Sequence, residues 1–237
     1  MTKEMFDRIL EFFPEDYDIS FGGMSEPFLN KEAVDMIELA CQRGRYVAVY
    51  TTLVGLDKKA LEKLISMPIS WCTLHVADKY GYAKISKTDE YYELVEMILK
   101  ARKADGDPFT NMCNAQALPD DRAYEICKKL GYEVFSEMTD RAGNLNEDNL
   151  IQNTIATGKV ICGNSRNNEL NSNIVLPDGS VVLCCMDYGL KHVLGNITTD
   201  TFEMIRNGEM MQYVRVGMNG DTTKDILCRH CSMAHVG

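Results

Sequence analysis

Hydrophobic and polar residues follow two alternating periods along the first two thirds of the chain. Segments with apolar residues three and four positions apart, typical of amphipathic helices, alternate with short apolar runs typical of buried parallel strands. The predicted helices cover residues 2–13, 31–44, 57–67, 89–106 and 119–131. The predicted strands cover residues 17–21, 46–52, 70–76, 108–114 and 132–137. This alternation predicts an α/β fold with a parallel sheet, either doubly wound or a barrel.

The pattern changes near residue 150. Residues 161–187 show no helical period, and within them "NSNIVL", the turn "PDG" and "SVVLCCMD" predict a β-hairpin. Residues 198–220 predict one or two short helices. We therefore expect an α/β domain at 1–155 and a small cysteine-bearing domain at 156–237. In the α/β domain, we expect the functional residues at the carboxyl ends of the strands.

Composition narrows the class of protein. The chain has 237 residues, of which 45% are hydrophobic, so it can bury a sizeable core and disorder is not expected. Its net charge of −10 argues against a general nucleic-acid or membrane-surface binder. It has neither an apolar run long enough to span a membrane nor the residue order of a signal peptide, so we expect a cytoplasmic protein. Nine cysteines in that compartment indicate core residues and metal ligands rather than disulfides.

The nine cysteines fall into two groups. Four lie on predicted helices and strands, where core packing is the simplest interpretation: Cys41, Cys72, Cys113 and Cys127. The other five lie at the ends of predicted elements after residue 155: Cys162, Cys184, Cys185, Cys228 and Cys231. The last two form a C-x₂-C pair, which presents two thiolates to one metal centre. Four thiolates suit either Zn²⁺ or an iron–sulfur cluster.

The hairpin predicts which cysteines meet. It can bring Cys162 and Cys184 together, and the returning tail can add Cys228 and Cys231. Cys184 and Cys185 point to opposite faces of a strand, so one of them is expected to be a ligand, and the spacing in "GSVVLC" favours Cys184. Three histidines near these cysteines are not needed, because four thiolates complete the site: His192, His230 and His235.

The C-terminal third resembles the SPASM domain, the auxiliary iron–sulfur extension of many radical S-adenosylmethionine enzymes. The resemblance rests on Cys162, "IVLPDGSVVLCCMD", "LGNI", the helix "TTDTFEMIRNGE" and "CRHC". It implies one auxiliary [4Fe–4S] cluster held by Cys162, Cys184, Cys228 and Cys231.

The upstream part resembles the catalytic domain of those enzymes, a partial parallel βα barrel, here missing its first strand. "ISFGGMSEPFLN" is similar to the motif in which a glutamate and strand-end backbone hold the amino group of S-adenosylmethionine. The resemblance implies that Glu26 is this carboxylate, with Gly23 and Ser25 shaping the turn, although glycine is commoner than Ser25. It also implies that Thr51 and Thr52 line the cofactor pocket.

The segment "DRAGN" also recurs before SPASM domains, so Arg141 and Asn144 are further candidates for the cofactor site. Taken without the family, Glu26 before a proline is a turn residue and Arg141 is a solvated surface charge. These simpler interpretations remain open at this point.

One family motif is not found in the sequence. The C-x₃-C-x₂-C motif that holds the cluster that cleaves S-adenosylmethionine does not occur, and the upstream cysteines lack its spacing. The chain is therefore expected to be either a fragment of a longer protein or a degenerate form, unable to cleave S-adenosylmethionine by itself. Whether it is an enzyme is uncertain from the sequence.

The resemblance implies a radical S-adenosylmethionine oxidoreductase acting on a peptide, a protein side chain or a small metabolite. In the intact enzyme a reductant such as flavodoxin or ferredoxin would supply the electron that splits the sulfonium, and the resulting 5′-deoxyadenosyl radical would abstract hydrogen from the substrate. Two alternatives are a non-enzymatic protein with a structural Cys₄ zinc site and an electron-transfer or regulatory partner. No nucleic-acid or membrane partner is expected.

Overall fold

The computed structural model describes residues 1–136, 140–144, 155–165 and 169–237 of the chain. It contains two compact units, Thr2–Glu137 and Met138–Gly237. The domain boundary predicted after residue 155 stays a prediction. No helix within the described ranges is long and apolar enough to cross a membrane.

The first unit is built on one parallel sheet of five strands in the order β1-β2-β3-β4-β5. The strands are β1 (Ile19–Phe21), β2 (Val47–Thr51), β3 (Trp71–His75), β4 (Met112–Asn114) and β5 (Val134–Phe135). Neighbours in sequence are neighbours in the sheet, without the reversal of order that defines a doubly wound fold. The α/β prediction is confirmed, and the strand order selects the partial barrel over the doubly wound sheet.

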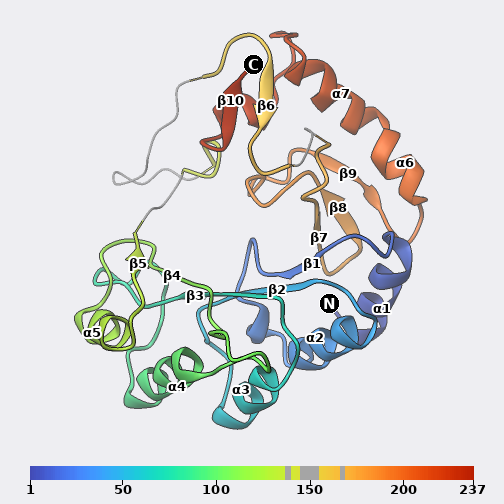
Figure 1. The fold of residues 1–237 in the computed structure, drawn as a ribbon. Helices are drawn as coiled ribbons and strands as arrows, with labels where there is room; N and C mark the ends of the chain where they lie inside the picture. Colours follow the sequence, from blue (N-terminus) through green and yellow to red (C-terminus); the bar gives the residue numbers. More distant parts are fainter. Residues whose placement is uncertain (137–139, 145–154, 166–168) are drawn as a thin grey trace. The chain divides into compact units, whose positions relative to one another are not determined.

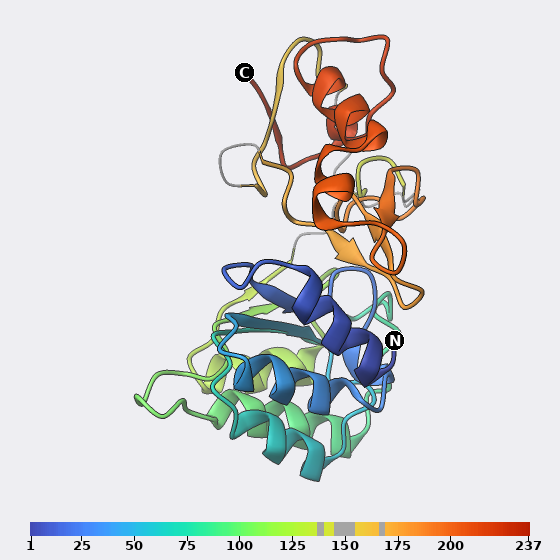
Figure 2. The ribbon, with the colours of Figure 1, turned by 90° about the vertical axis from the view of Figure 1, so that its right-hand side faces the viewer.

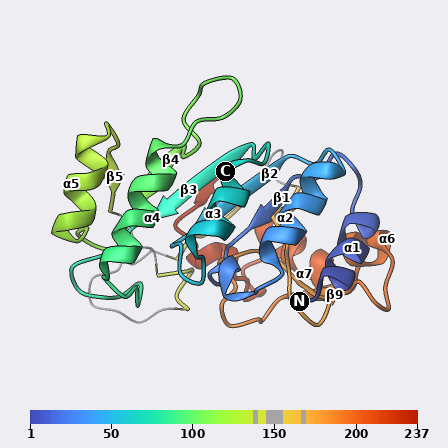
Figure 3. The ribbon, with the colours of Figure 1, turned by 90° about the horizontal axis from the view of Figure 1, so that it is seen from below.

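Helices connect these strands and cover one face of the sheet (Figures 1 and 3). They are α2 (Ala33–Gln42), α3 (Lys58–Ile65), α4 (Asp89–Lys100) and α5 (Asp121–Lys129), and α1 (Lys3–Phe12) precedes β1 and packs on α2. They share a face because each crossover between adjacent parallel strands has the same hand. This arrangement leaves the carboxyl ends of β1 to β4 joined by loops at one edge of the sheet, including a short 3₁₀ helix, η1 (Pro27–Leu29).

Local sequence explains where the helices begin. Thr2, Asp57, Thr88 and Asp120 precede helices and accept hydrogen bonds from first-turn backbone N–H groups. The predicted helix over 89–106 is too long, since α4 ends at Lys100. Ala101 is extended, and residues 102–108 instead form a turn with Gly106 at a φ of 91°.

The second unit contains a three-stranded antiparallel sheet, a two-stranded sheet and short helices. The predicted hairpin is present as β7 (Ile174–Val175) and β8 (Ser180–Val182), and β9 (Val193–Asn196) adds a third strand. The predicted short helices are α6 (Phe202–Asn207) and α7 (Glu209–Met218), which follow one another and pack on β9 (Figure 2). The second sheet pairs β6 (Val160–Cys162) with β10 (Ala234–Val236), and neither strand was predicted.

Candidate metal centre and strand-end site

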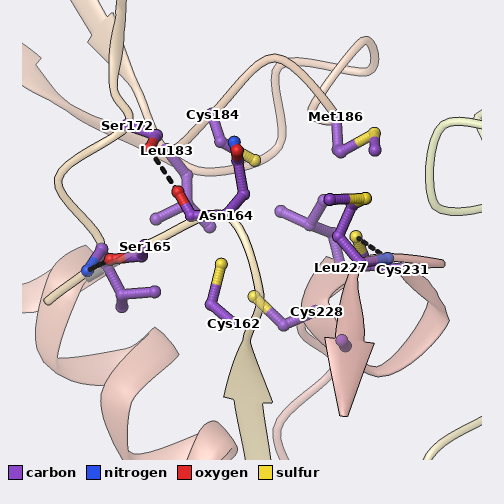
Figure 4. A pocket seen from close by; sticks show the side chains of 13 residues that line it. Cys162, Asn164, Ser165, Ser172, Leu183, Cys184, Met186, Leu227, Cys228 and Cys231 are labelled. Atoms are coloured by element: carbon purple, nitrogen blue, oxygen red, sulfur yellow. Dashed lines mark hydrogen bonds between the residues drawn. The ribbon is translucent and has the colours of Figure 1, made fainter. Parts of the chain in front are cut away.

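Four cysteines of the second unit line a single cavity. Cys162 ends β6, Cys184 follows β8, Cys228 lies in the 3₁₀ helix η3 (Leu227–His230), and Cys231 comes directly after it. All four border a cavity of about 40 Å³, and Figure 4 shows their side chains arranged around it. The structure thus brings together the four residues predicted as ligands.

Strand pairing and one buried arginine hold this arrangement. Antiparallel pairing places Ala234 opposite Cys162, so the chain leaving Cys231 runs back along β6. Arg229, in the middle of the C-x₂-C pair, is 5% exposed and donates hydrogen bonds to the carbonyls of Ala156, Gly158 and Gly217. The guanidinium therefore ties η3 to the segment before β6 and to α7.

Burial and mutual repulsion disfavour thiolates at this site unless a cation is present. Burial raises the pKa of Cys184 to about 12, with smaller contributions from the neighbouring thiols of Cys185, Cys231 and Cys162. Burial likewise raises the pKa of Cys228, and the nearby thiols raise it further. The pKa of Cys231 is raised for the same reasons, partly offset by the Met233 N–H, which donates to its Sγ at 3.4 Å. A metal centre would supply the positive charge that four thiolates require.

The arrangement of the thiols bears on whether the site suits a single ion or a cluster. Four sulfurs bound to one Zn²⁺ at about 2.3 Å lie about 3.8 Å apart and enclose no free volume. Within the described residues, no three Cys, His, Asp or Glu side chains converge closely enough to hold one ion. Four thiols around a cavity of about 40 Å³ leave room for a group larger than a single ion, as an iron–sulfur cluster is.

The remaining cysteines and histidines lie outside this cavity. Cys185 does not line it, although its thiol is close enough to raise the pKa of Cys184. Cys72, Cys113 and Cys127 are fully buried in the first unit, as expected for core residues, whereas Cys41 is partly exposed. His192 is buried beside Asp187, with 3.5 Å between Nδ1 and Oδ2, and none of the histidines is among the lining residues.

The first unit contains a second polar cluster, at the carboxyl ends of β1 and β2. Glu26 accepts four hydrogen bonds there: from Thr51 Oγ1 at 2.8 Å and Phe28 N at 3.2 Å on one oxygen, and from Thr52 N at 2.5 Å and Thr52 Oγ1 at 2.6 Å on the other. A carboxylate has about four acceptor positions. The structure therefore joins Glu26 with both predicted threonines, and the protein itself satisfies its carboxylate.

The predicted glycine-rich turn lies beside this cluster. Gly23 has a φ of 100°, a conformation that favours glycine, and Ser25 is exposed. Gly22 has a φ of 145°, and a Cβ there would lie 2.8 Å from the Cβ of Tyr50, so only glycine lets the turn pass β2 this closely. The turn is thus shaped by Gly22 as much as by Gly23.

Arg141 and Asn144 belong to the second unit and contact the loop after Cys184. Asn144 Nδ2 donates to the carbonyl of Met186 at 3.0 Å, and the guanidinium of Arg141 lies 5.3 Å from the centre of the Tyr188 ring. The simple interpretation of Arg141 as a solvated charge is therefore incomplete. Its role as a cofactor contact stays a prediction, as does that of Asn144.

Arg229 and Asp78 are among the buried polar residues that sequence reasoning missed. Arg229 was visible only as a charge between two cysteines, a position that alone does not reveal burial. Asp78, 1% exposed at the end of β3, accepts hydrogen bonds from the backbone N–H groups of Tyr80, Tyr82 and Ala83. The sequence signal for Asp78 was its place in the loop after a buried strand.

Comparison with known proteins agrees with these features. Residues 162–232 match the SPASM family, described as an iron–sulfur cluster-binding domain. All four cavity cysteines fall within this segment. The chain thus carries a SPASM domain in its C-terminal third. No curated protein sequence matches the chain.

Two solved structures are similar to nearly the whole chain. The crystal structure of BtrN in complex with AdoMet and 2-DOIA has a TM-score of 0.62 at 17% identity and covers 98% of this chain and 80% of that chain. The crystal structure of selenomethionine BtrN in an open conformation has a TM-score of 0.55 at 15% identity, with the same coverage. At such identities the likeness concerns the fold, and it confirms the partial barrel followed by a small cysteine-rich region.

Proposed function

We propose that this chain is a radical S-adenosylmethionine/SPASM oxidoreductase polypeptide whose second unit binds an auxiliary [4Fe–4S] cluster on Cys162, Cys184, Cys228 and Cys231. The observation that carries the proposal is the meeting of these four cysteines around one cavity, inside the segment that matches the SPASM family. A [4Fe–4S] cluster takes four cysteine thiolates, and the chain supplies that number.

The proposed cluster site needs no residue beyond those on the cavity wall. Apolar residues, among them Leu170, Leu183 and Leu227, form much of the remaining wall and would shield the cluster from water. When bound, the cluster would supply a one-electron acceptor and donor. The residues of this chain would hold it, limit solvent access and donate N–H groups to its sulfur ligands.

The first unit is proposed to bind S-adenosylmethionine at the carboxyl ends of its strands. Support comes from the turn at Gly22 and Gly23 and from the fold shared with BtrN, whose structure was determined with AdoMet. The contacts of Glu26 refine its proposed role. Because the protein satisfies its carboxylate, an incoming ammonium group would replace a threonine hydroxyl at Glu26 rather than meet a free charge.

The substrate and the reductant belong to the same proposal. The proposed substrate is a peptide, a protein side chain or a small metabolite, because a fold likeness at 17% identity does not select among them. A flavodoxin or ferredoxin remains the proposed electron donor.

Anaerobic purification and metal analysis test the cluster directly. We expect a brown protein with broad absorption near 400 nm and about four irons and four sulfides per chain. Cys228→Ala should lose most of the iron, whereas Cys41→Ala, which removes a thiol outside the cavity, should keep it. A colourless protein with one zinc per chain would instead support the alternative of a structural Cys₄ zinc site.

A further inference from the structure

The short segment 141–144 has a backbone that only a specific environment would maintain. Three consecutive residues are left-handed: Arg141 at a φ of 50°, Ala142 at 57° and Gly143 at 78°. This region is unfavourable for residues with a Cβ. The turn closes on the Arg141 carbonyl, which accepts hydrogen bonds from Asn144 N at 3.3 Å and Asn144 Nδ2 at 2.8 Å. The segment thus presents the Asn144 amide in a fixed orientation.

That amide contacts the turn that follows Cys184. The second Nδ2 hydrogen bond of Asn144 goes to the Met186 carbonyl at 3.0 Å, and a Cβ placed on Gly189 would lie 2.8 Å from Asn144 Oδ1. Gly189 has no positive φ that would demand glycine. A side chain at position 189 would therefore push the Asn144 amide away from its present position.

The residue held by Asn144 also belongs to the cavity wall. Met186 lines the cavity with Cys184, and a backbone hydrogen bond from Met186 lowers the pKa of the Cys184 thiol against the larger, opposite effect of burial. The other side of the turn is held independently by Asp187, whose carboxylate accepts from the N–H groups of Lys191 and His192 at 3.0 and 2.7 Å. Within the turn, Tyr188 N donates to the Met186 carbonyl at 2.9 Å and Asp187 N to the Cys184 carbonyl at 3.1 Å, and Asn144 adds a side-chain anchor to the same Met186 carbonyl.

We propose that Asn144 is a positioning residue for the auxiliary cluster. Asn144 binds the Met186 carbonyl and packs on Gly189, and these contacts hold the Met186 N–H toward the Cys184 sulfur. This orientation raises the reduction potential of the cluster. The inference rests on the proposed function of this site. Hydrogen bonds to cluster sulfurs stabilise the more negative, reduced state, and solvent access also sets the potential. Loss of one such bond should change the ratio of reduced to oxidised cluster about three- to tenfold at a fixed potential.

The test is a redox titration of the anaerobically reconstituted full chain, followed by electron paramagnetic resonance. Asn144→Leu should lower the ratio of reduced to oxidised cluster about three- to tenfold, and a tenfold change corresponds to about 59 mV for one electron. Asn144→Gln, which keeps an amide donor, should restore part of the shift. The matched control is Asn196→Leu, which removes an amide bound to the Asp178 carbonyl in the β7–β8 turn, outside the cavity wall, and should leave the potential unchanged.

Gly189→Ala provides a second perturbation, because its methyl group would displace the Asn144 amide without removing it. It should lower the potential in the same direction as Asn144→Leu. In the double variant Asn144→Leu/Gly189→Ala the two effects should not add, since both act through one contact.

The outcomes separate the two proposals. If the parent chain takes up no iron, the proposed function fails, and this inference fails with it. If the cluster forms but Asn144→Leu has the potential of the parent chain and of Asn196→Leu, the inference is overturned and the cluster assignment stands. Fully additive shifts in the double variant would likewise overturn the role of the contact between Asn144 and Gly189.

Discussion

Replacing Glu26 by glutamine keeps the shape of the side chain but removes its charge and turns one acceptor oxygen into an NH₂ donor. In the structure both oxygens of Glu26 accept two hydrogen bonds each, from the backbone or hydroxyl groups of Phe28, Thr51 and Thr52. A glutamine can satisfy the two donors on one side only. On the other side a threonine hydroxyl can rotate to accept, but a backbone N–H cannot.

The magnitude follows from these contacts. Hydrogen bonds to a charged acceptor contribute about 1.5–3 kcal/mol each and neutral ones about 0.5–1.5 kcal/mol, while an unsatisfied donor costs about 1–3 kcal/mol. Glu26 is only partly buried, so the lower ends of these ranges apply. In Glu26→Gln the two hydrogen bonds on one side become weaker, because their acceptor is neutral, and on the other side the NH₂ group faces a backbone N–H that loses its acceptor. Together these changes should lower the free energy of unfolding by about 2–3 kcal/mol.

The assay is urea unfolding of the full chain under reducing conditions, followed by circular dichroism, without S-adenosylmethionine. The matched control is Glu32→Gln, because the exposed Glu32 accepts a single bond, from Lys3 N at 2.7 Å. That control should stay within about 0.5 kcal/mol of the parent protein, as is usual for surface substitutions. Equal stability of the Glu26→Gln and Glu32→Gln proteins would show that Glu26 does not hold the ends of β1 and β2 together.

Three further predictions concern the metal site and the buried polar groups. Arg229→Met removes three hydrogen bonds to carbonyls, so it should lower the free energy of unfolding by about 3 kcal/mol or more and reduce iron retention. The control Arg206→Met, at a partly exposed ion pair, should cost less than about 1 kcal/mol. Equal losses of stability in the two variants would contradict the anchoring role of Arg229. Burial opposes ionisation of Asp78, but four backbone N–H groups outweigh that effect and lower the pKa of its carboxyl. The stabilisation by Asp78 is therefore present above about pH 4 and is lost as the pH falls through the lowered pKa. The stability difference between the parent protein and Asp78→Asn should shrink in acid, and a constant difference from about pH 6 to about pH 2 would refute this prediction. Cys184→Ala should lose iron while Cys185→Ala keeps it, and equal iron retention would leave the choice of Cys184 unsupported.

Local sequence determined most of the secondary structure. Apolar periodicity and capping residues such as Thr2 and Asp57 act within a few positions of one another, so the helices and parallel strands could be read from the chain. The error at the end of α4 has the same origin: helical periodicity continues past Lys100, while the turn that stops the helix depends on pairing between Arg102 and Pro108.

The candidate metal centre was also accessible from sequence, because cysteine spacing and the hairpin limit which thiols can meet. Strands β6 and β10 were not, since their short segments form a sheet only by pairing across more than seventy residues. The burial of Arg229 likewise depends on acceptors at Ala156, Gly158 and Gly217, which are distant in sequence.

The sequence by itself determined the alternation of helix and strand, the cysteine-bearing C-terminal third and the candidate ligands, because each depends on residue type and short spacing. Only the tertiary structure decided the order of strands in the sheet, the four donors that satisfy Glu26 and the contact of Asn144 with the turn after Cys184. Those features arise from contacts between segments far apart along the chain. Their partners are selected by packing and hydrogen-bond satisfaction in the folded molecule, which no local pattern records.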